Sequence, residues 1–396
     1  MGARKTVNIA MIGYKFMGKA HSNAWLKAPR FFETPSQPVL KVVCGRHQEP
    51  LEEFAARWGW EETVADWEEV VNRDDIDVVD IACPTFLHFD IAMAAAKAGK
   101  AIFCEKPFTL NLEQAERLAA EVEERGVVNY LNHNYRRCPA IGQAKAMIEA
   151  GELGRIFHWR GAYLQSWIVD PEFPLTWQLR EEAAGAGPHW DLNSHSVDLA
   201  RYLVGDIKAV NAMTAQFIGE RPLPDEASSG AFQAGEGRGD KARVTVEDAA
   251  FMLAEFDNGA LGSFEASRFA TGRKNFNVFE ISGEKGALAF DLERMNELQF
   301  LRNSDPAATR GFTTIHATEA DHPYVAHWWP PAHNIGYEHT FVHAVADFLD
   351  AMETGKEIRP SFRDGTECIR VLVAGLESAR SGRRVAVSEV GDPGTA

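Results

Sequence analysis

The chain has 396 residues, more than one ordinary hydrophobic core holds, so its length predicts two domains. Its formal net charge is −16, and this acidic balance argues against a nucleic-acid or anionic-membrane partner and favours neutral or weakly charged small molecules. The five cysteines include no CxxC pair, and no apolar run is long enough to span a bilayer. We therefore expect no disulfide framework, no membrane span and a cytoplasmic location.

Short apolar runs alternate with helical segments in the first third of the chain. This alternation predicts a doubly wound parallel sheet covered on both faces, an α/β domain that we assign to residues 1–132. The predicted strands are 7–13, 39–44, 78–82, 101–104 and 127–131, and the predicted helices are 17–27, 50–58, 89–98 and 112–125.

The pattern changes after residue 132, where strand-like runs separated by turns predominate. We assign residues 133–396 to an α+β domain with a largely antiparallel sheet and helices near its start and at its C-terminal end. A glycine-rich polar stretch at 228–240 indicates a loop or insertion. The predicted helices here are 139–150 and 191–203, and the predicted strands are 155–163, 209–217, 248–256, 260–266, 277–282, 287–290 and 298–301.

A glycine turn follows the first predicted strand. Its sequence is Gly13-Tyr14-Lys15-Phe16-Met17-Gly18, in which glycines hold the outer positions of a dinucleotide fingerprint and Lys15 holds the middle one. The first glycine allows the tight turn, the last lets the helix pack closely, and the helix N-terminus attracts a pyrophosphate. We expect the cofactor to bind here; the alternative is a plain strand-to-helix turn. The cofactor-binding candidates are Gly13, Lys15, Phe16, Met17 and Gly18.

The end of the second predicted strand bears on the type of cofactor. NAD-preferring sites carry an acid there for the ribose hydroxyls, whereas an arginine accommodates the 2′-phosphate of NADP. This chain has Cys44-Gly45-Arg46 and no acid. Arg46 therefore favours NADP or dual use slightly over NAD; the alternative is a solvated surface arginine.

The fourth predicted strand ends in Glu105-Lys106-Pro107. A lysine at the carboxyl end of a parallel strand points into the crevice where ligands bind in such sheets. Close to a positive nicotinamide an ammonium is harder to keep, so Lys106 is a candidate for proton chemistry near neutral pH.

Several motifs together resemble the glucose–fructose oxidoreductase / inositol dehydrogenase / rhizopine catabolism family, and the resemblance spans the chain. The stretches that carry it are 13–18 with Ala20-His21, 84–88, 98–100 and 105–107, followed by 134–137, 163–167, 191–195, 200–205 and 322–324. The departure at Lys15 bears on cofactor preference and not on the fold.

The resemblance implies a nicotinamide-dependent dehydrogenase that oxidises a secondary hydroxyl, at C3 of a sugar, anhydrosugar or glycoside. It implies a Rossmann domain followed by an open, mostly antiparallel sheet that assembles homodimers or homotetramers. It also adds Pro84, His88, Glu105 and Lys106 to the cofactor-binding residues. It places Lys106 with Asp191 and His195 around the reacting hydroxyl.

Asp191 and His195 are four residues apart in a helical pattern, which places both side chains on one face. The preceding Gly185-Ala186-Gly187-Pro188 lets a helix start close to another element. Without the resemblance, such a pair is more often an ordinary helix-surface interaction. With it, we expect His195 to be the general base and Lys106 and Asp191 to bind and polarise the hydroxyl.

Four further side chains are candidates for the sugar pocket, because aromatic rings stack on pyranose faces and amides bind hydroxyls. They are Tyr135, Arg136, Gln165 and Trp167. Tyr135 and Trp167 are equally compatible with core or interface positions. Histidines gather between residues 316 and 343 without a zinc signature, so we assign no metal site.

Two other functions are compatible with the same residues. One is a redox-cycling enzyme that retains its nicotinamide and cleaves or epimerises glycosides through a 3-keto intermediate. The other is a non-catalytic, cofactor-binding regulator, against which the joint presence of Lys106, Asp191 and His195 argues.

Overall fold

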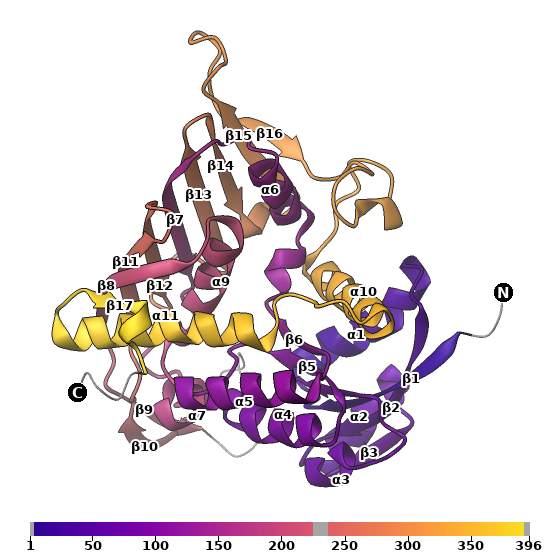
Figure 1. The fold of residues 1–396 in the computed structure, drawn as a ribbon. Helices are drawn as coiled ribbons and strands as arrows, with labels where there is room; N and C mark the ends of the chain where they lie inside the picture. The colour runs from indigo at the N-terminus through magenta and orange to yellow at the C-terminus, as the bar shows by residue number, and fades with distance from the viewer. Residues whose placement is uncertain (1–3, 225–236, 392–396) are drawn as a thin grey trace. The chain divides into compact units, whose positions relative to one another are not determined.

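The computed structural model describes residues 4–224 and 237–391, which form two compact units (Figure 1). The first unit is the chain up to Arg137 together with Gly336–Glu367, and the second is Cys138–Ile335 together with the chain from Cys368 onward. The division predicted at residue 132 stays a proposal about separately folding parts. The contacts group residues 336–367 with the first unit, whereas the prediction assigns them to the second domain.

The first unit contains a parallel sheet with the strand order β3-β2-β1-β4-β5-β6, which confirms the predicted doubly wound fold. The strand order reverses between β1 and β4, and ligands bind at such a switch point. The strands are β1 (Lys5–Ile12), β2 (Ser36–Cys44), β3 (Glu62–Val64), β4 (Val78–Ile81), β5 (Ala101–Glu105) and β6 (Asn129–Asn132).

Capping residues mark where helix α5 of the first unit begins and ends. The Asn111 side chain accepts from the Gln114 N–H (2.9 Å) at the start of α5, and Gly126 ends that helix at φ 62°. Helix α10, from the C-terminal part of the chain, packs against α1. The helices are α1 (Phe16–Phe31), α2 (Gln48–Trp58), α3 (Trp67–Val71), α4 (His88–Lys97), α5 (Leu112–Arg125) and α10 (Tyr337–Thr354).

The second unit contains a mixed sheet in the order β16-β15-β14-β13-β7-β12-β11-β8-β17, and all its pairs are antiparallel except β7 with β12. The predicted, largely antiparallel sheet is thus confirmed. Its strands are β7 (Ile156–Leu164), β8 (Ile207–Ala215), β11 (Ala249–Phe256), β12 (Leu261–Ser267), β13 (Phe276–Gly283), β14 (Gly286–Asp291), β15 (Glu297–Arg302), β16 (Thr313–His316) and β17 (Val385–Ala386).

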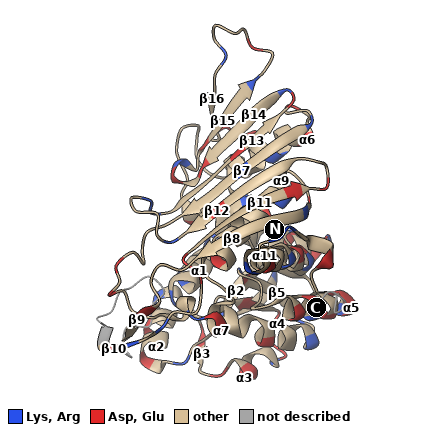
Figure 2. Ribbon diagram, turned by 90° about the vertical axis from the view of Figure 1, so that its left-hand side faces the viewer, with Lys and Arg blue, Asp and Glu red and all other residues tan. Residues whose placement is uncertain are grey.

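Helices cover one face of this sheet. Helix α9 packs on β7 and β12, and α6 packs on β14 and β15. Figure 2 looks onto the opposite face, where the strands lie in front of α6 and α9. The helices are α6 (Pro139–Glu149), α7 (Glu181–Ala184), α8 (Pro188–Asp191), α9 (Asn193–Leu203) and α11 (Phe362–Ser381), whose residues up to Glu367 belong to the first unit.

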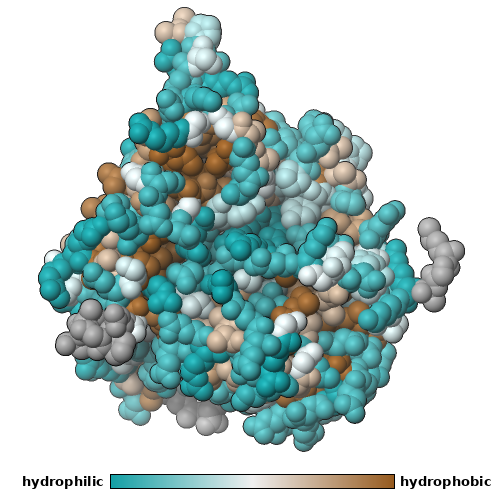
Figure 3. Space-filling view, viewed as in Figure 1, coloured by the Kyte–Doolittle hydropathy of each residue, from teal (hydrophilic) through white to brown (hydrophobic). Residues whose placement is uncertain are grey.

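Two features lie outside the two main sheets. The predicted loop 228–240 lies largely outside the described residues, and its end belongs to β10 (Gly237–Arg243), which pairs with β9 (Glu220–Pro224). Within the two described stretches, no helix is both long and apolar enough to cross a bilayer. The five cysteines carry free thiols. Hydrophilic residues predominate on the face of the molecule that Figure 3 shows.

Candidate active site

The glycine turn after β1 is as tight as its two outer glycines predict. Gly13 has φ 108°, and a Cβ there would lie 2.5 Å from the Ala82 carbonyl oxygen at the end of β4. A Cβ on Gly18 would lie 2.7 Å from the Gly13 carbonyl oxygen, so α1 packs directly on the turn. This close-packed turn at the start of a helix fits the pyrophosphate of a dinucleotide.

Two cations lie at the carboxyl ends of β1 and β2. Lys15 is the N-cap residue of α1, and its side chain is largely exposed. Desolvation by its protein neighbours and then the nearby charge of Arg46 lower the pKa of its ammonium. The ring of Tyr14 packs on Gly45, where a Cβ would lie 2.4 Å from the ring. Lys15 and Arg46 therefore lie close enough for their positive charges to interact. Phe16 and Met17, which follow Lys15, are exposed and half-buried.

A buried charge network lies beneath the strand ends. His21 Nδ1 is 2.7 Å from Asp80 Oδ1, and His21 Nε2 is 3.0 Å from Glu105 Oε1. Trp25 donates to Asp80 (2.7 Å), and Asn132 donates to Glu105 (2.6 Å). Burial would by itself lower the pKa of His21, but the two carboxylates outweigh it and raise this pKa to about 10. His21 is thus an imidazolium that donates to both acids.

Sequence reasoning did not find this network. Asp80 lies in an apolar run that predicts a strand, and His21 lies in the motif Ala20-His21. A carboxylate inside a buried parallel strand is itself a signal, because such a group needs a partner. The partners of His21, Asp80 and Glu105, lie 59 and 84 positions further along the sequence, so local patterns do not reveal the pairing.

Lys106 follows β5 directly and is half-buried. The turn after it is connected to the end of β4 through His88, whose Nδ1 lies 2.9 Å from the Pro107 carbonyl and whose Nε2 lies 2.9 Å from the Cys83 carbonyl. Burial lowers the pKa of His88, so the ring is neutral and donates to one carbonyl at a time. In this structure His88 therefore braces the Lys106 turn, and half-buried Pro84 begins the turn after β4.

The predicted helix over 191–203 is interrupted. Asp191 ends α8, and His195 lies in the first turn of α9, with Leu192 between the two helices. The predicted continuous helix is therefore wrong at this point, although Leu192 keeps helical dihedrals. His195 is buried, and its ring centroid lies 5.7 Å from that of Tyr163.

The start of α8 is held by a close backbone contact. The Glu247 carboxylate accepts from the N–H groups of Gly187 (3.0 Å) and His189 (2.9 Å). A Cβ on Gly187 would lie 2.0 Å from the Glu247 carbonyl oxygen, so this position has room only for glycine. The predicted glycine entry, which lets a helix start close to another element, is confirmed.

Two residues that the sequence did not single out connect the candidates of the second unit. Arg268 Nη2 donates to Asp191 Oδ2 (2.8 Å), and its guanidinium lies over the Trp167 ring, 5.3 Å from the centroid. Trp167 donates to Gln165 Oε1 (2.8 Å). Asn275 Oδ1 then accepts from Gln165 (3.0 Å) and from Tyr163 (2.7 Å). Neither Arg268 nor Asn275 lies in a pattern that marks a ligand site.

The candidates therefore fall into two sets. The first unit holds the cofactor candidates and Lys106, together with Tyr135 and Arg136, which are buried in the turn after β6. The second unit holds Gln165, Trp167, Asp191 and His195. Among the described residues, no three His, Cys, Asp or Glu side chains converge as a metal site would require.

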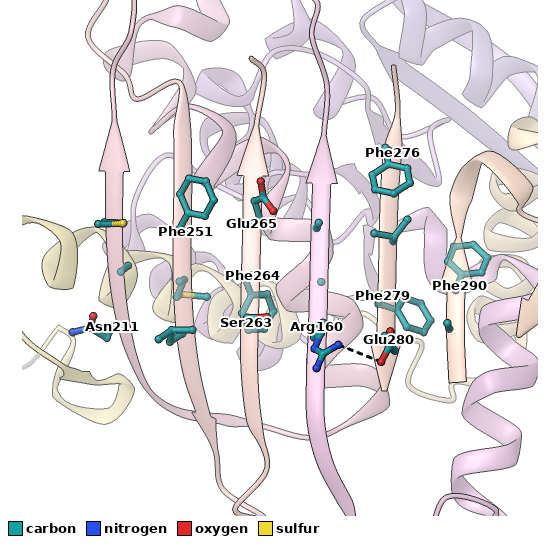
Figure 4. A pocket seen from close by; sticks show the side chains of 18 of the residues that line it. Arg160, Asn211, Phe251, Ser263, Phe264, Glu265, Phe276, Phe279, Glu280 and Phe290 are labelled. Carbon is teal, nitrogen blue, oxygen red and sulfur yellow. Dashed lines mark ion pairs between the residues drawn. The ribbon is translucent and has the colours of Figure 1, made fainter. Parts of the chain in front are cut away.

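A depression of about 910 Å³ lies on the uncovered face of the second unit's sheet (Figure 4). Phe251 and Phe276 project from β11 and β13 toward it, and Arg160 pairs with Glu280 across β7 and β13 (3.5 Å). None of the candidate catalytic residues lines it.

Two family models match the chain. Residues 7–133 match the model of an oxidoreductase family with an NAD-binding Rossmann fold, and residues 141–289 match the GFO/IDH/MocA C-terminal domain. Levoglucosan dehydrogenase of Pseudarthrobacter phenanthrenivorans is 42% identical over 388 residues, 98% of this chain and 99% of that protein.

Two solved structures are similar to nearly the whole chain. An oxidoreductase domain protein from Kribbella flavida is 44% identical, with a TM-score of 0.91 over 97% of this chain and 99% of that one. A levoglucosan dehydrogenase in complex with NADH and levoglucosan is 42% identical, with a TM-score of 0.90 over 97% and 100% of the two chains.

Proposed function

The chain belongs to the GFO/IDH/MocA family of NAD-binding oxidoreductases, and on that premise we propose that it oxidises the C3 hydroxyl of a sugar, anhydrosugar or glycoside. Full-length similarity to levoglucosan dehydrogenase, in a chain that carries Lys106, Asp191 and His195, is the observation behind this proposal. On this proposal the enzyme is a dehydrogenase that acts on a small uncharged substrate.

The three side chains divide the proton chemistry. His195 takes the hydroxyl proton as the carbinol hydrogen leaves as a hydride, because an imidazole accepts a proton near neutral pH. Lys106 donates to the oxygen of the same hydroxyl and Asp191 acts with it to bind and polarise that group, while the single O–H hydrogen is directed at His195. The chemistry that bound nicotinamide supplies is acceptance of the hydride, and the product is a ketone. Gln165, Trp167, Tyr135 and Arg136 are proposed to hold the remainder of the sugar.

The test is a panel of levoglucosan, glucose, inositols and aryl glycosides with NAD and NADP, monitored by absorbance of the reduced cofactor. His195→Ala should lower kcat by about 10²–10⁴-fold without changing the Kd for NADH. His316→Ala, which changes an exposed histidine at the end of β16, is the matched control. Wild-type turnover in His195→Ala would exclude His195 as the base.

The same panel separates the alternatives. A redox-cycling enzyme would consume glycoside without net release of reduced cofactor, and its nicotinamide would survive dialysis. A regulator would bind cofactor and oxidise none of the sugars.

We propose that the cofactor site accepts NADP as well as NAD. Lys15 and Arg46 place two positive charges at the strand ends, where a 2′-phosphate would be favoured. Arg46→Ala should raise the KM for NADP more than the KM for NAD. Equal changes in the two KM values would show that Arg46 does not bind the 2′-phosphate and is a solvated surface residue.

We propose that the uncovered sheet face assembles a homodimer or homotetramer. Met213 and Leu253 on it are 66% and 64% exposed, and strands of this face are mostly uncharged in Figure 2. Leu253→Glu should shift the mass measured by light scattering toward the monomer. Phe312→Glu, which changes an exposed phenylalanine outside the depression, should leave it unchanged.

A further inference from the structure

A guanidinium is buried beside the candidate acid of the second unit. Arg268 follows β12 directly, and its side chain is 1% exposed, whereas that of Asp191 is 29% exposed. Nη2 donates to Asp191 Oδ2 at 2.8 Å, and Nη1 donates to the Gln178 carbonyl at 3.3 Å. The charged group thus lies behind the carboxylate, which itself retains contact with solvent.

The surroundings of Arg268 single out Asp191 as its ionic partner. Two other carboxylates contribute to its field, but both have their own donors: Glu247 binds the N–H groups at the start of α8, and Asp248 binds those of Phe217 and Ile218. Burying a guanidinium is tolerated only with such a bonded partner. The pair therefore restricts both the position of Arg268 and that of the Asp191 carboxylate.

The same guanidinium also contacts a candidate sugar-binding ring. It lies 5.3 Å from the centroid of Trp167, within the range of a cation–π contact. Trp167 in turn donates to Gln165, which binds Asn275. One buried side chain thus links the acid proposed to bind the reacting hydroxyl with the aromatic and amide groups proposed to hold the ring.

We propose that Arg268 is a positioning residue, which fixes the Asp191 carboxylate and the Trp167 ring in one arrangement and thereby orients the substrate hydroxyl. This inference rests on the role of Asp191 in the proposed function. Arg268 touches neither substrate nor cofactor in this role. A displacement of about 1 Å at a reacting group can cost about 100-fold in rate, so loss of the pair should lower kcat.

The test is a double-mutant cycle on the full-length enzyme, with the sugar of the panel that gives the highest wild-type turnover. Arg268→Met removes the charge and keeps much of the volume, and we expect a fall of about 100-fold in kcat with an unchanged KM for NAD. Arg268→Lys should recover part of this loss. In an Asp191→Asn background, Arg268→Met should add less than about threefold, because both changes remove the same interaction.

Arg221→Met is the matched control, because Arg221 is equally buried in the same unit but donates to backbone carbonyls of residues 168, 170 and 173 instead of Asp191. We expect both arginine variants to lower Tm, but only Arg268→Met to lower kcat at a temperature where the proteins are folded. If Arg268→Met does not fold, Arg268→Lys completes the same cycle.

The outcomes separate the two levels of the proposal. Wild-type kcat in Asp191→Asn would overturn the role of Asp191 and this inference with it. A large loss in Asp191→Asn with normal kcat in the Arg268 variants would overturn the positioning role alone. Losses that multiply in the double variant would overturn it as well.

Discussion

His21 of the first unit and His189 of the second are both buried, but His21 is charged and His189 is neutral. In the first unit both ring nitrogens of His21 face carboxylates, and Asp80 and Glu105 raise its pKa to about 10 against the effect of burial. In the second unit His189 lies between the Leu372 carbonyl (2.9 Å) and the Asn193 amide (3.0 Å). Burial lowers the pKa of His189 to about 4.

Hydrogen-bond partners explain the difference. The Asn193 amide donates to His189 Nδ1, so a neutral ring that donates from Nε2 satisfies both contacts. His21 meets two acceptors, and only the imidazolium can donate to both. Burial alone therefore does not determine the charge of a histidine: His21 is charged because its two acceptors are carboxylates, whereas the partners of His189 are a neutral carbonyl and a neutral amide. The first unit thus stabilises a charge cluster next to Lys106, whereas the surroundings of His189 in the second unit favour a neutral ring.

Replacing His21 should have the largest effect. His21→Asn leaves two buried carboxylates without their cation, which should cost about 3–5 kcal/mol of the free energy of unfolding at pH 7. Because the folded-state pKa of His21 is raised, its stabilisation is complete below pH 6.5 and is lost as pH rises through about 10. The gap between wild type and variant should therefore narrow in urea titrations from pH 7 to pH 9.5. A gap independent of pH would mean that His21 is neutral; His47→Asn, at an exposed histidine, is the control.

Replacing His189 should give a pH dependence of the opposite sign. Its folded-state pKa is depressed, so its contribution is complete above pH 6.5 and is lost as pH falls through about 4. In this window it lowers the free energy of unfolding by at most about 1.4 kcal/mol per pH unit. His189→Gln should make the free energy of unfolding less sensitive to acid than that of wild type. A steeper acid dependence in the variant would contradict a neutral ring.

A smaller effect is expected from the backbone contact next to His189. Gly187→Ala would place a Cβ 2.0 Å from the Glu247 carbonyl oxygen, and relief of this overlap should cost about 1–3 kcal/mol in the free energy of unfolding. Because Gly187 begins the helix that ends at Asp191, kcat should fall as well. Gly219→Ala meets no atom within 4 Å and should change neither quantity. Equal behaviour of the two variants would mean that α8 moves freely.

Local patterns in the sequence predicted most of the regular structure. The alternation in 248–256, 260–266 and 277–282 reappears as β11, β12 and β13 within a residue or two, because each strand has one face against helices and one face uncovered. Strand β3, with three residues, is too short to show a period. The return of α10 to the first unit depends on packing between distant segments, which no local pattern contains.

The site was predictable to the extent that a residue stood next to a recognisable local feature. Lys106 followed a strand and Gly13 ended one, so topology placed both. Arg268 follows β12 and Asn275 precedes β13 in a mostly antiparallel sheet, where strand ends carry no such rule. Their partners, Asp191 and Tyr163, are 77 and 112 residues away, so only the folded chain brings them together.

The position of β7 has a consequence for how the protein folds. This strand lies in the middle of the nine-stranded sheet, between β12 and β13, which begin at residues 261 and 276. At a synthesis rate of about 5–20 residues per second, both edges of β7 wait on the order of 5–20 s for their partners to leave the ribosome. Unpaired strand edges template aggregation during such an interval. The nascent second unit should therefore depend on chaperones more than the first, whose β1, β2 and β3 pair in the order in which they are made.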